Sequence, residues 1–386
     1  MRALLVAVAL LLAACGVGPT ADGGRPTTDG GRPTTPEPVE AFEQLKRLGR
    51  GVNFGNALEA PNEGEWGMTL EPRFFDLVKE GGFATIRLPV RWSAHAQANA
   101  PYTIDETFFA RVDWAIDQAT QRGLNIVVNM HHYEELMTAP DAHRERFTAL
   151  WRQIAARYRD RPSSVLFELC NEPNGMSSAA WAQLFRPALA AVRETNPTRT
   201  VVVGGVDWNS VKGLLELELP EDDRHLIATF HYYLPFQFTH QGAEWVNDSA
   251  GWLGTEWKGS GSDKAYVTFD LDKVFEWSRE KKRPVWLGEF GAYSKADLAS
   301  RARWTAWVAR SAEKRGMAWA YWEFGAGFGV YDRARGEWVG EIRAALVPGP
   351  AALPSRSRRA SPRPPGGKSV TRMTSTAASS RARRPA

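Results

Sequence analysis

The stretch Val165-Leu-Phe-Glu-Leu-Cys-Asn-Glu-Pro173 decides the fold, together with its later counterpart Pro284-Val-Trp-Leu-Gly-Glu-Phe-Gly291. Each stretch begins as a short apolar run and carries a glutamate near its end, Glu172 in the first and Glu289 in the second. An ionisable side chain at the tip of a buried parallel strand lies at the mouth of a barrel, where such folds carry their chemistry. Either glutamate alone is more simply explained as a helix cap or as the partner of an arginine. Together they predict a site at which two carboxylates divide acid and nucleophile roles.

Short apolar runs alternate with helical patterns along most of the chain, and there are eight of them. The expected strands are Gly51 to Phe54, Ala84 to Leu88, Asn125 to Met130, Val165 to Leu169, Thr200 to Val203, Ile227 to Phe230, Val285 to Leu287 and Met317 to Tyr321. Residues 108–119 and 147–158 between them carry apolar side chains at three-to-four spacing, which predicts outer helices. Alternation of this kind implies a parallel sheet buried on both faces, and eight strands favour a closed α/β barrel, the (β/α)8 TIM barrel. No Gly-x-Gly-x-x-Gly follows the first run, which argues against a dinucleotide-binding fold.

The length and composition fit one catalytic domain, residues 39–347, flanked by tails. The chain has 386 residues, of which 43% are hydrophobic, enough to bury a large core. Residues 1–14 combine a basic start, a short apolar core and small residues, as a signal peptide does. Residues 15–38 are mostly Gly, Pro, Thr and Asp and are expected to form a disordered linker.

The end of the signal segment, Leu12-Ala-Ala-Cys15, resembles the bacterial lipobox. The resemblance implies cleavage before Cys15, a lipid on its sulfur, and an exported protein tethered to the cell envelope; ordinary signal cleavage and secretion is the alternative. The other cysteine is Cys170, so the processed chain cannot form an intramolecular disulfide. We expect Cys170 to be a buried small residue rather than a nucleophile.

Residues 348–386 form a basic tail that we expect to be disordered. Residues 351–386 carry nine Lys or Arg and no acid, so a whole-chain charge of +4 leaves −5 on residues 1–350. A nucleic-acid surface needs basic residues on a folded face with stacking aromatics. Here they lie among Ser, Pro and Gly, and we expect no nucleic-acid partner.

Polar side chains gather where the expected strands end, at one face of the barrel. They are Asn56, Glu59, Arg87, His131, His132, Asn171, Glu172, His231, Tyr232, Tyr233, Glu289 and Trp322. Sixteen tryptophans accompany them, and aromatic rings stack on the flat C–H faces of sugars. Two glutamates in this company predict glycoside hydrolysis.

Several motifs match a family. Ile86-Arg-Leu-Pro89, Asn171-Glu-Pro173, His231-Tyr-Tyr233 and Gly288-Glu-Phe-Gly291 resemble glycoside hydrolase family 5, the bacterial cellulases, over about residues 40–346. Three longer segments are similar to the Thermotoga-type endoglucanase and mannanase subgroup of that family. They are Gly55-Asn-Ala-Leu-Glu-Ala-Pro-Asn-Glu63, Asn129-Met-His-His-Tyr-Glu-Glu-Leu136 and Phe230-His-Tyr-Tyr-Leu-Pro-Phe-Gln-Phe-Thr-His-Gln241.

The resemblance implies that Glu172 is the acid/base and Glu289 the nucleophile. The chemistry asks for the same division, because the acid must give up a proton and later take one back, while the nucleophile must stay ionised. Arg87 and Tyr233 would support the nucleophile by charge and hydrogen bonding. Asn171 would donate a hydrogen bond to the sugar 2-hydroxyl.

The remaining site residues are expected to bind substrate. His131 and His132 would border the cleft, and His231 would lie near the acid/base. Asn56 and Glu59 follow the first strand, Trp322 would be the platform under the ring being cut, and Trp208 and Trp245 would flank further subsites. The segment 234–268, with Trp252 and Trp257, would form an extended cleft wall. Seven tryptophans are assigned to packing or to helix surfaces: Trp66, Trp114, Trp151, Trp181, Trp277, Trp304 and Trp307.

The sequence therefore predicts a secreted or lipid-anchored retaining endo-β-1,4-glucanase, active on soluble or amorphous β-glucans and on glucomannan, and monomeric. Retention predicts carboxyl groups about 5 to 5.5 Å apart, against about 6.5 to 9.5 Å for inversion. No cofactor is expected. Zinc held by the paired histidines is less well supported, since strand one lacks the His-x-His of barrel metallohydrolases. The same residues also permit a β-mannanase or mixed-linkage glucanase on the same fold, or a surface glycan-binding lipoprotein without catalysis.

Overall fold

The computed structural model describes residues 38–349. The predicted signal peptide, Cys15, nearly all of the linker and the basic tail from residue 350 lie outside the described residues. Within the described part of the chain, no helix is both long enough and apolar enough to cross a membrane.

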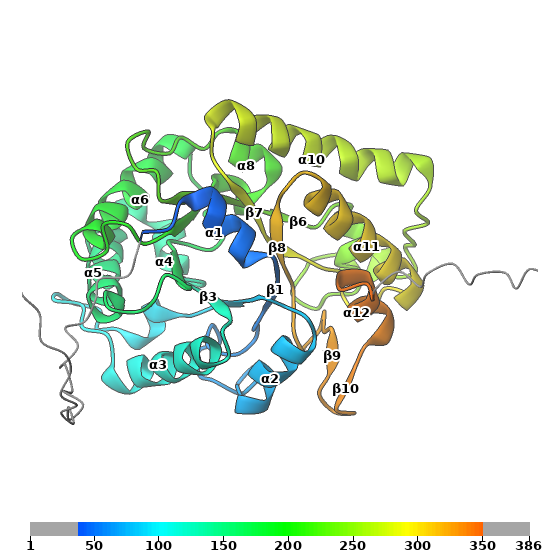
Figure 1. Ribbon diagram of the computed structural model, residues 1–386, viewed down its shortest axis with the longest axis horizontal. Coiled ribbons are helices and arrows are strands. Elements are labelled where there is room, and N and C mark those ends of the chain that lie inside the picture. The colour runs from blue at the N-terminus through cyan, green and yellow to red at the C-terminus, as the bar shows by residue number, and fades with distance from the viewer. Residues whose placement is uncertain (1–37, 350–386) are drawn as a thin grey trace, which may run out of the picture. The chain divides into compact units, whose positions relative to one another are not determined.

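Eight parallel strands close into a barrel (Figure 1). The strands are β1 (Arg50–Asn53), β2 (Thr85–Leu88), β3 (Asn125–Asn129), β4 (Val165–Glu168), β5 (Val201–Gly204), β6 (Leu226–Tyr232), β7 (Val285–Phe290) and β8 (Ala318–Tyr321). Each pairs with the next in sequence, and β1 also pairs with β8, so that Val52 lies between Ile86 and Tyr321. The predicted (β/α)8 barrel is confirmed, with all eight strands within three residues of the expected ends.

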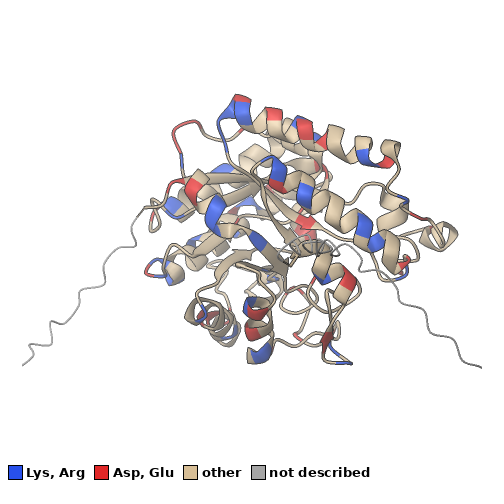
Figure 2. Ribbon diagram, turned by 45° about the vertical axis from the view of Figure 1, so that its right-hand side comes forward, with Lys and Arg blue, Asp and Glu red and all other residues tan. Residues whose placement is uncertain are grey.

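Helices surround the barrel and present their charged faces to solvent (Figure 2). The long ones are α2 (Pro72–Glu80), α3 (Glu106–Gln121), α5 (Pro140–Tyr158), α6 (Ser178–Arg193), α10 (Gly261–Lys281) and α11 (Leu298–Lys314). Both predicted helical patterns are confirmed, one in α3 and one in α5. The Asp105 side chain begins α3 by accepting hydrogen bonds from the amides of Thr107 and Phe108. Ser260 and Asp263 begin α10 with a reciprocal capping box.

Short elements complete the chain. They are α1 (Ala41–Leu48), α4 (Glu134–Thr138), α7 (Val206–Asn209), α8 (Val211–Leu215), α9 (Phe236–Thr239), α12 (Gly340–Leu346), the 3-10 turns η1 (Trp92–His95) and η2 (Ser249–Trp252), and the hairpin of β9 (Tyr331–Asp332) and β10 (Glu337–Trp338). Helix α1 packs its apolar face against the amino-terminal end of the barrel interior. There Leu45 and Leu48 join a buried cluster with Leu166, Ile227 and Trp286.

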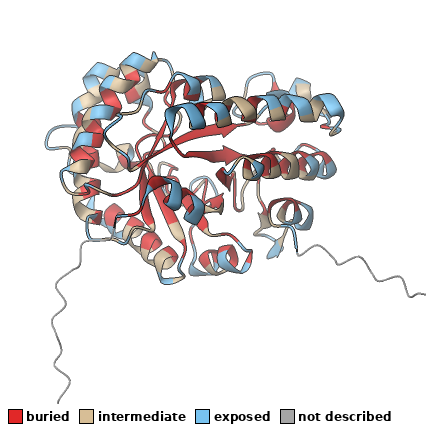
Figure 3. Cartoon of the chain, turned by 45° about the horizontal axis from the view of Figure 1, so that its top comes forward, coloured by how far each residue is buried: buried red, intermediate tan, exposed pale blue. Residues whose placement is uncertain are grey.

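The barrel interior changes from apolar to polar along its axis. The strands are buried nearly throughout (Figure 3), so every side chain pointing inward loses water. At the amino-terminal end these side chains are apolar, whereas near the carboxyl ends they include Asn53, Arg87, Glu168 and Glu289, all 4% exposed or less. Buried charges must be paired to be tolerated. The most deeply buried ion pairs, those of Arg87 with Glu168 and Glu289, therefore lie at the mouth that the sequence predicted.

Candidate active site

Arg87 is the centre of the polar cluster. It lies on β2 with no exposed surface, and its guanidinium donates to carboxylates on two other strands. Nε and Nη2 donate to Glu168 Oε2 and Oε1 at 2.6 and 2.7 Å, and Nη1 donates to Glu289 Oε1 at 2.5 Å. The amide oxygens of Asn53 and Asn171 accept from Nη1 and Nη2 at 2.9 and 2.8 Å. Burial alone would lower the pKa of Arg87, but the two carboxylates raise it above its ordinary value.

Glu289 is held from several sides. It lies within β7 rather than at its tip, and its carboxylate accepts from Arg87 Nη1 and, through Oε2, from the Tyr233 hydroxyl at 2.8 Å. His231 Nδ1 lies 3.6 Å from the same Oε2. Burial raises the pKa of Glu289, while His231 and Arg87 oppose the rise. The structure thus places both predicted supporting residues, Arg87 and Tyr233, against this carboxylate.

Glu172 lies in a loop, which is a correction to its expected position at a strand end. Strand β4 stops at Glu168, and Glu172 follows in a left-handed conformation with φ 50°. Its side chain is 27% exposed, against 6% for Glu289, and its Oε1 hydrogen bonds with His231 Nδ1 at 2.7 Å. Burial raises the pKa of Glu172 to about 7, with Arg87 lowering it and Glu168 raising it further.

His231 stands between the two glutamates. Strand β6 shifts register between Phe230 and His231, and this irregularity turns the imidazole toward both carboxylates. Burial lowers the pKa of His231 to about 4, so the ring is neutral near neutral pH. One donor atom from each of Glu172, His231 and Glu289 lies within 4.8 Å of the other two.

Two carboxylates and an imidazole are also a set that zinc accepts. The histidine pair that suggested zinc from the sequence, His131 and His132, does not belong to this group. In this cluster the donor atoms are already engaged, because Glu289 Oε1 accepts from Arg87 Nη1 and Glu172 Oε1 is hydrogen-bonded to His231 Nδ1. We therefore assign the cluster to acid–base chemistry.

Asn171 is oriented by Arg87. Its Oδ1 accepts from Arg87 Nη2, which leaves the amide nitrogen free to donate toward the cleft. His131 is buried and lies parallel to Trp322, with ring centroids 5.5 Å apart and planes 5° apart. Gly55 gives Trp322 its space, because a Cβ at that position would lie 2.8 Å from the indole. The rings of His131 and Trp322 thus form one platform.

Two predicted subsite tryptophans are exposed on loops. Trp208 is 58% exposed, and its backbone amide donates to Pro173 O at 3.2 Å, next to the loop that carries Glu172. A hollow of about 840 Å³ lies beside Trp208 and is lined also by Met176, Lys212 and Glu216. Three successive residues there, 207–209, have φ between 54° and 59°. Such backbone strain is typical of functional loops.

Trp245 is 61% exposed and packs edge-on against Tyr293 at 5.0 Å. The Glu244 carboxylate ties this loop to the one after β7, accepting from the Tyr293 hydroxyl at 2.8 Å and from Lys295 Nζ at 2.6 Å. The prediction that residues 234–268 form a cleft wall is wrong for the end of this segment. Trp257 is only 2% exposed, and α10 begins at Gly261. The indole of Trp257 belongs to the core.

Two further expectations for substrate contacts change. Glu59 is 1% exposed, and its carboxylate accepts the amides of Asn56 and Ala57, so it shapes the loop after β1 instead of facing the cleft. Burial raises its pKa to about 8. Asn56 itself is partly exposed in a left-handed conformation with φ 65°. Trp66, assigned to packing from the sequence, is 41% exposed and faces the partly exposed His132 with ring centroids 5.6 Å apart.

The other tryptophans assigned to packing are in the core or against it. Trp151, Trp181, Trp277 and Trp304 are buried, and Trp114 and Trp307 pack against the same cluster. Cys170 is buried as expected, and burial raises the pKa of its thiol. Neither these tryptophans nor Cys170 is assigned to the cleft.

Sequence reasoning missed the buried polar residues behind the site. They are Asn53, Asn129, Glu168, Asn209 and Glu323, each with no exposed surface. The sequence could have indicated Glu168, because it lies inside the apolar run of a buried strand and a buried charge requires a partner. Glu323 accepts three backbone amides of residues 325–328, and burial raises its pKa to about 7.

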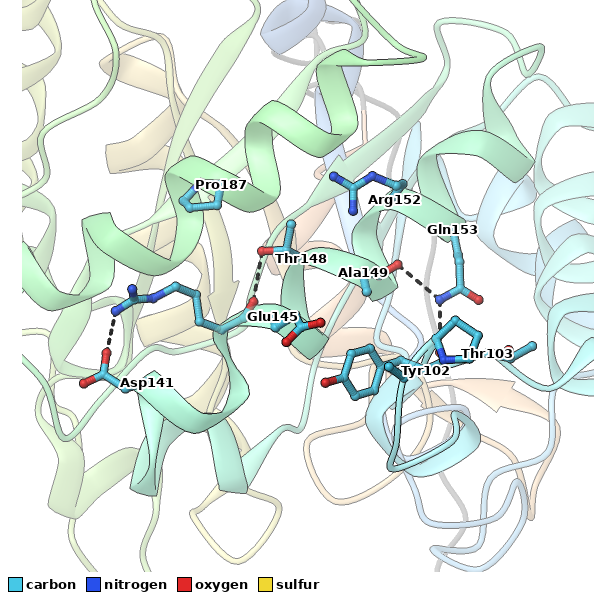
Figure 4. Close-up of a pocket in the computed structure, with 12 residues that line it drawn as sticks. Tyr102, Thr103, Asp141, Glu145, Thr148, Ala149, Arg152, Gln153 and Pro187 are labelled. Carbon is cyan, nitrogen blue, oxygen red and sulfur yellow. Dashed lines mark hydrogen bonds and ion pairs between the residues drawn. The ribbon is translucent and has the colours of Figure 1, made fainter.

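A separate hollow of about 830 Å³ lies on the outer helices (Figure 4). It is lined by the loop at Tyr102, by Arg144 and Gln153 of α5, and by Pro187 of α6. Gln153 Nε2 donates to Tyr102 O at 3.0 Å across its floor. None of the predicted site residues lines this hollow, so the mouth of the barrel is the candidate active site.

Comparison with known proteins points to one family. A family model described as cellulase (glycosyl hydrolase family 5) matches residues 49–327. Endoglucanase H of Acetivibrio thermocellus is 37% identical over 330 residues, covering 83% of this chain and 35% of that protein. The cellulase/esterase CelE of the same organism is 30% identical, and the match spans 37% of its length. The chain therefore spans about a third of these two curated relatives.

Solved structures of similar length agree. Cel5A of Thermotoga maritima in complex with mannotriose is 49% identical, with a TM-score of 0.79, covering 80% of this chain and all of that one. The same protein in complex with cellobiose is 50% identical at the same TM-score and coverage. A hyperthermophilic endo-β-1,4-glucanase with bound substrate is 42% identical, with a TM-score of 0.78, covering 80% of this chain and 99% of that one. The predicted resemblance to the Thermotoga-type subgroup is confirmed.

Proposed function

Because the chain belongs to glycosyl hydrolase family 5, we propose that it is a retaining endo-β-1,4-glucanase acting on soluble or amorphous β-glucans. One observation carries the proposal. One oxygen of Glu172 and one oxygen of Glu289 lie within 4.8 Å of each other and of a ring nitrogen of His231. The two side chains differ in exposure, with 27% for Glu172 and 6% for Glu289. This proximity of the nearest oxygens supports double displacement, for which the two carboxyl groups lie about 5 to 5.5 Å apart.

The first step forms a covalent intermediate. The Glu289 carboxylate attacks the anomeric carbon, the bond from that carbon to the glycosidic oxygen breaks, and the Glu172 proton passes to the departing oxygen. Glu172 suits this role because a pKa of about 7 keeps it protonated under mildly acidic conditions. Arg87 and Tyr233 suit theirs because they stabilise the ionised form of Glu289.

The second step releases the sugar. Water attacks the anomeric carbon, Glu172 takes a proton from it, and Glu289 leaves as a carboxylate. Each glutamate raises the pKa of a neighbouring one by charge repulsion. Once Glu289 is esterified its negative charge is gone, so the pKa of Glu172 falls and the residue can serve as a base. Asn171, whose amide nitrogen is free, is positioned to donate to the 2-hydroxyl as the transition state forms.

A second candidate function is β-mannan cleavage. Its support is the similarity to a Cel5A structure described as a complex with mannotriose, alongside the cellobiose complex of the same protein. Glucose and mannose differ only in the configuration of the 2-hydroxyl, the group that Asn171 faces in the proposal. A site that contacts this hydroxyl through a single amide donor can tolerate both sugars.

A substrate panel tests these proposals. Reducing-sugar release by the full chain is measured on carboxymethylcellulose, barley β-glucan, glucomannan and galactomannan, with Glu289→Gln as the blank. Activity on the glucans that is lost in the variant supports the endoglucanase, and activity mainly on galactomannan supports the mannanase. Polysaccharide binding without any release would instead support a glycan-binding lipoprotein. An α-configured first product seen by proton NMR would refute retention.

We also propose that the protein is exported, attached by a lipid at Cys15, and monomeric. The support is the lipobox-like Leu12-Ala-Ala-Cys15 and the apolar segment before it. The test is labelling with a radioactive fatty acid in a bacterial host, where the wild type should be labelled and Cys15→Ala should not. Equal labelling of the two proteins would refute lipidation at Cys15. Light scattering of the purified protein tests the monomer.

A further inference from the structure

Glu168 is a buried carboxylate to which the proposed reaction gives no role. It is the last residue of β4 and has no exposed surface. Strand β3 lies between β4 and β2, the strand that carries Arg87. The two oxygens of Glu168 accept from Arg87 Nε and Nη2 at 2.6 and 2.7 Å. Both distances are short for hydrogen bonds between charged groups. A carboxylate with no exposure is costly unless it is paired in this way.

The pairing fixes how the guanidinium is shared. An arginine can hold one carboxylate through two parallel bonds, and here that two-bond edge is given to Glu168 rather than to Glu289. Glu289 receives a single bond, from Nη1, and Asn171 receives one from Nη2. The two-bond arrangement also sets the plane of the guanidinium, and therefore the directions in which the remaining N–H groups point.

We propose that Glu168 is a positioning residue for the reaction. It holds Arg87 by two bonds and neutralises its charge, so that Arg87 orients Glu289 without making the catalytic glutamates much stronger acids. This inference rests on the proposed function. Glu168 touches no reacting atom, and it acts through Arg87.

The charges around the site support this assignment. The groups that act on the two catalytic glutamates are Arg87 from β2, Glu168 from β4, His231 from β6 and Tyr233 after β6. Among these, the neutral histidine and the tyrosine leave Arg87 and Glu168 as the fixed charges. Burial is the main cause of the raised pKa of Glu172, and of the two fixed charges Arg87 lowers this pKa while Glu168 raises it. Without Glu168, the positive charge of Arg87 would act unopposed on both glutamates.

Glu168→Gln tests the charge. The glutamine has the same size and no charge, and its amide oxygen can accept one of the two Arg87 bonds. Both catalytic glutamates then become stronger acids, so both limbs of the plot of kcat/KM against pH should move toward lower pH, by about one unit, the size of shift that one neighbouring charge commonly gives. At pH 7 the protonated fraction of Glu172 then falls from about one half to about one eleventh, so kcat/KM should fall about fivefold.

Two matched variants separate charge from geometry. Glu168→Asp keeps the charge but is one methylene too short for both bonds, so the limbs should stay near their wild-type positions while kcat falls about tenfold or more. Glu63→Gln is the control for losing a two-bond pair, because Glu63 accepts from Arg111 Nε and Nη2 at 2.7 and 2.8 Å outside the active site. Its pH profile should match the wild type.

The pH profiles are measured with the full chain on cellotetraose and barley β-glucan, whose leaving groups need the proton of Glu172, and melting temperatures record folding. Carbon-13 NMR of labelled glutamate carboxyls gives the ionisation of Glu172 without turnover. An inactive wild type would refute the proposed function, whereas the NMR titration would still test Glu168. A folded Glu168→Gln whose limbs and Glu172 titration match the wild type would overturn the inference. If Glu168→Gln does not fold, a folded Glu168→Asp with unchanged kcat would overturn it instead.

Discussion

Removing the Tyr233 hydroxyl isolates one hydrogen bond to the nucleophile. Its oxygen lies 2.8 Å from Glu289 Oε2, the oxygen that Arg87 does not contact. Tyr233→Phe keeps the ring, which packs edge-on against His240 at 5.0 Å and Phe328 at 6.2 Å. The substitution therefore deletes a donor to an ionised carboxylate while leaving the packing in place.

The magnitude follows from the type of bond. A hydrogen bond to a charged group contributes about 1.5 to 3 kcal/mol, and each 1.36 kcal/mol corresponds to one unit of pKa. The Tyr233 hydroxyl lowers the pKa of Glu289 by stabilising its ionised form, so its loss should raise that pKa by about one to two units. Because the nucleophile must be ionised, the acidic limb of kcat/KM should move to higher pH by the same amount.

The alkaline limb should stay where Glu172 sets it, at about pH 7. The rise of the acidic limb therefore narrows the bell-shaped profile from one side and lowers its maximum, with a loss of about 10- to 100-fold at pH values below the acidic limb of the wild type. The measurement is kcat/KM on cellotetraose from pH 4 to 9, because the leaving group of this substrate needs the proton of Glu172 and its solutions are not viscous.

The matched control is Tyr232→Phe. The neighbouring Tyr232 hydroxyl donates to Asp270 Oδ2 at 3.3 Å, on the helix side of the barrel and outside the active site. Its loss should leave both limbs unchanged. If Tyr233→Phe folds and its acidic limb coincides with that of Tyr232→Phe, the hydrogen bond does not tune Glu289 and the reasoning is refuted.

Three other predictions follow from the same network. Glu172→Ala should lose about 10²- to 10⁴-fold on barley β-glucan but far less on a dinitrophenyl glycoside, whose leaving group needs no proton; equal losses on both would contradict the acid role. Glu59→Gln should flatten the pH dependence of the melting temperature. The raised pKa of Glu59 means that its contribution to stability is present below about pH 4.5 and lost as pH rises through about 8, so parallel curves for the two proteins would be the contrary result. Asn209→Ala should destabilise the fold by about 1 to 3 kcal/mol in urea unfolding, because Asn209 is buried against His231 Nε2 at 3.4 Å; an unchanged midpoint would show that this contact is not needed.

The barrel was predictable because its signal is local and repeated. Each strand is an apolar run of about the same length, and the carboxyl ends of parallel strands meet at one mouth. This placed Arg87, His231 and Glu289 at one face from spacing alone. The strand ends were less certain, because hydrogen bonding between strands, and not hydrophobicity, decides where a strand stops. Leu169 and Cys170 are as buried as the strand before them, yet they belong to the loop.

The residues that were misplaced are those whose surroundings come from distant segments. Glu59 looks like a strand-end acid in sequence, but its carboxylate accepts hydrogen bonds from two amides of its own loop. Trp66 has no neighbour in sequence that marks it as a cleft residue, and only the folded chain brings it to His132. Trp257 was misplaced for the opposite reason, since contacts with the rest of the barrel bury it. Loops connecting strands to helices carry no periodic pattern from which such contacts can be inferred.

The two glutamates differ because one lies in a strand and the other in a loop. Glu289 is fixed by the ladder of β7 and by two donors, so its charge stays in one place, as a nucleophile requires. Glu172 stands beyond the end of β4, with its side chain a quarter exposed and one neutral histidine as its contact. Such a carboxyl can gain and lose a proton without breaking an ion pair. The different roles of Glu172 and Glu289 therefore depend on the position at which β4 ends. Glu168 is the last residue of β4, and through Arg87 it influences both glutamates.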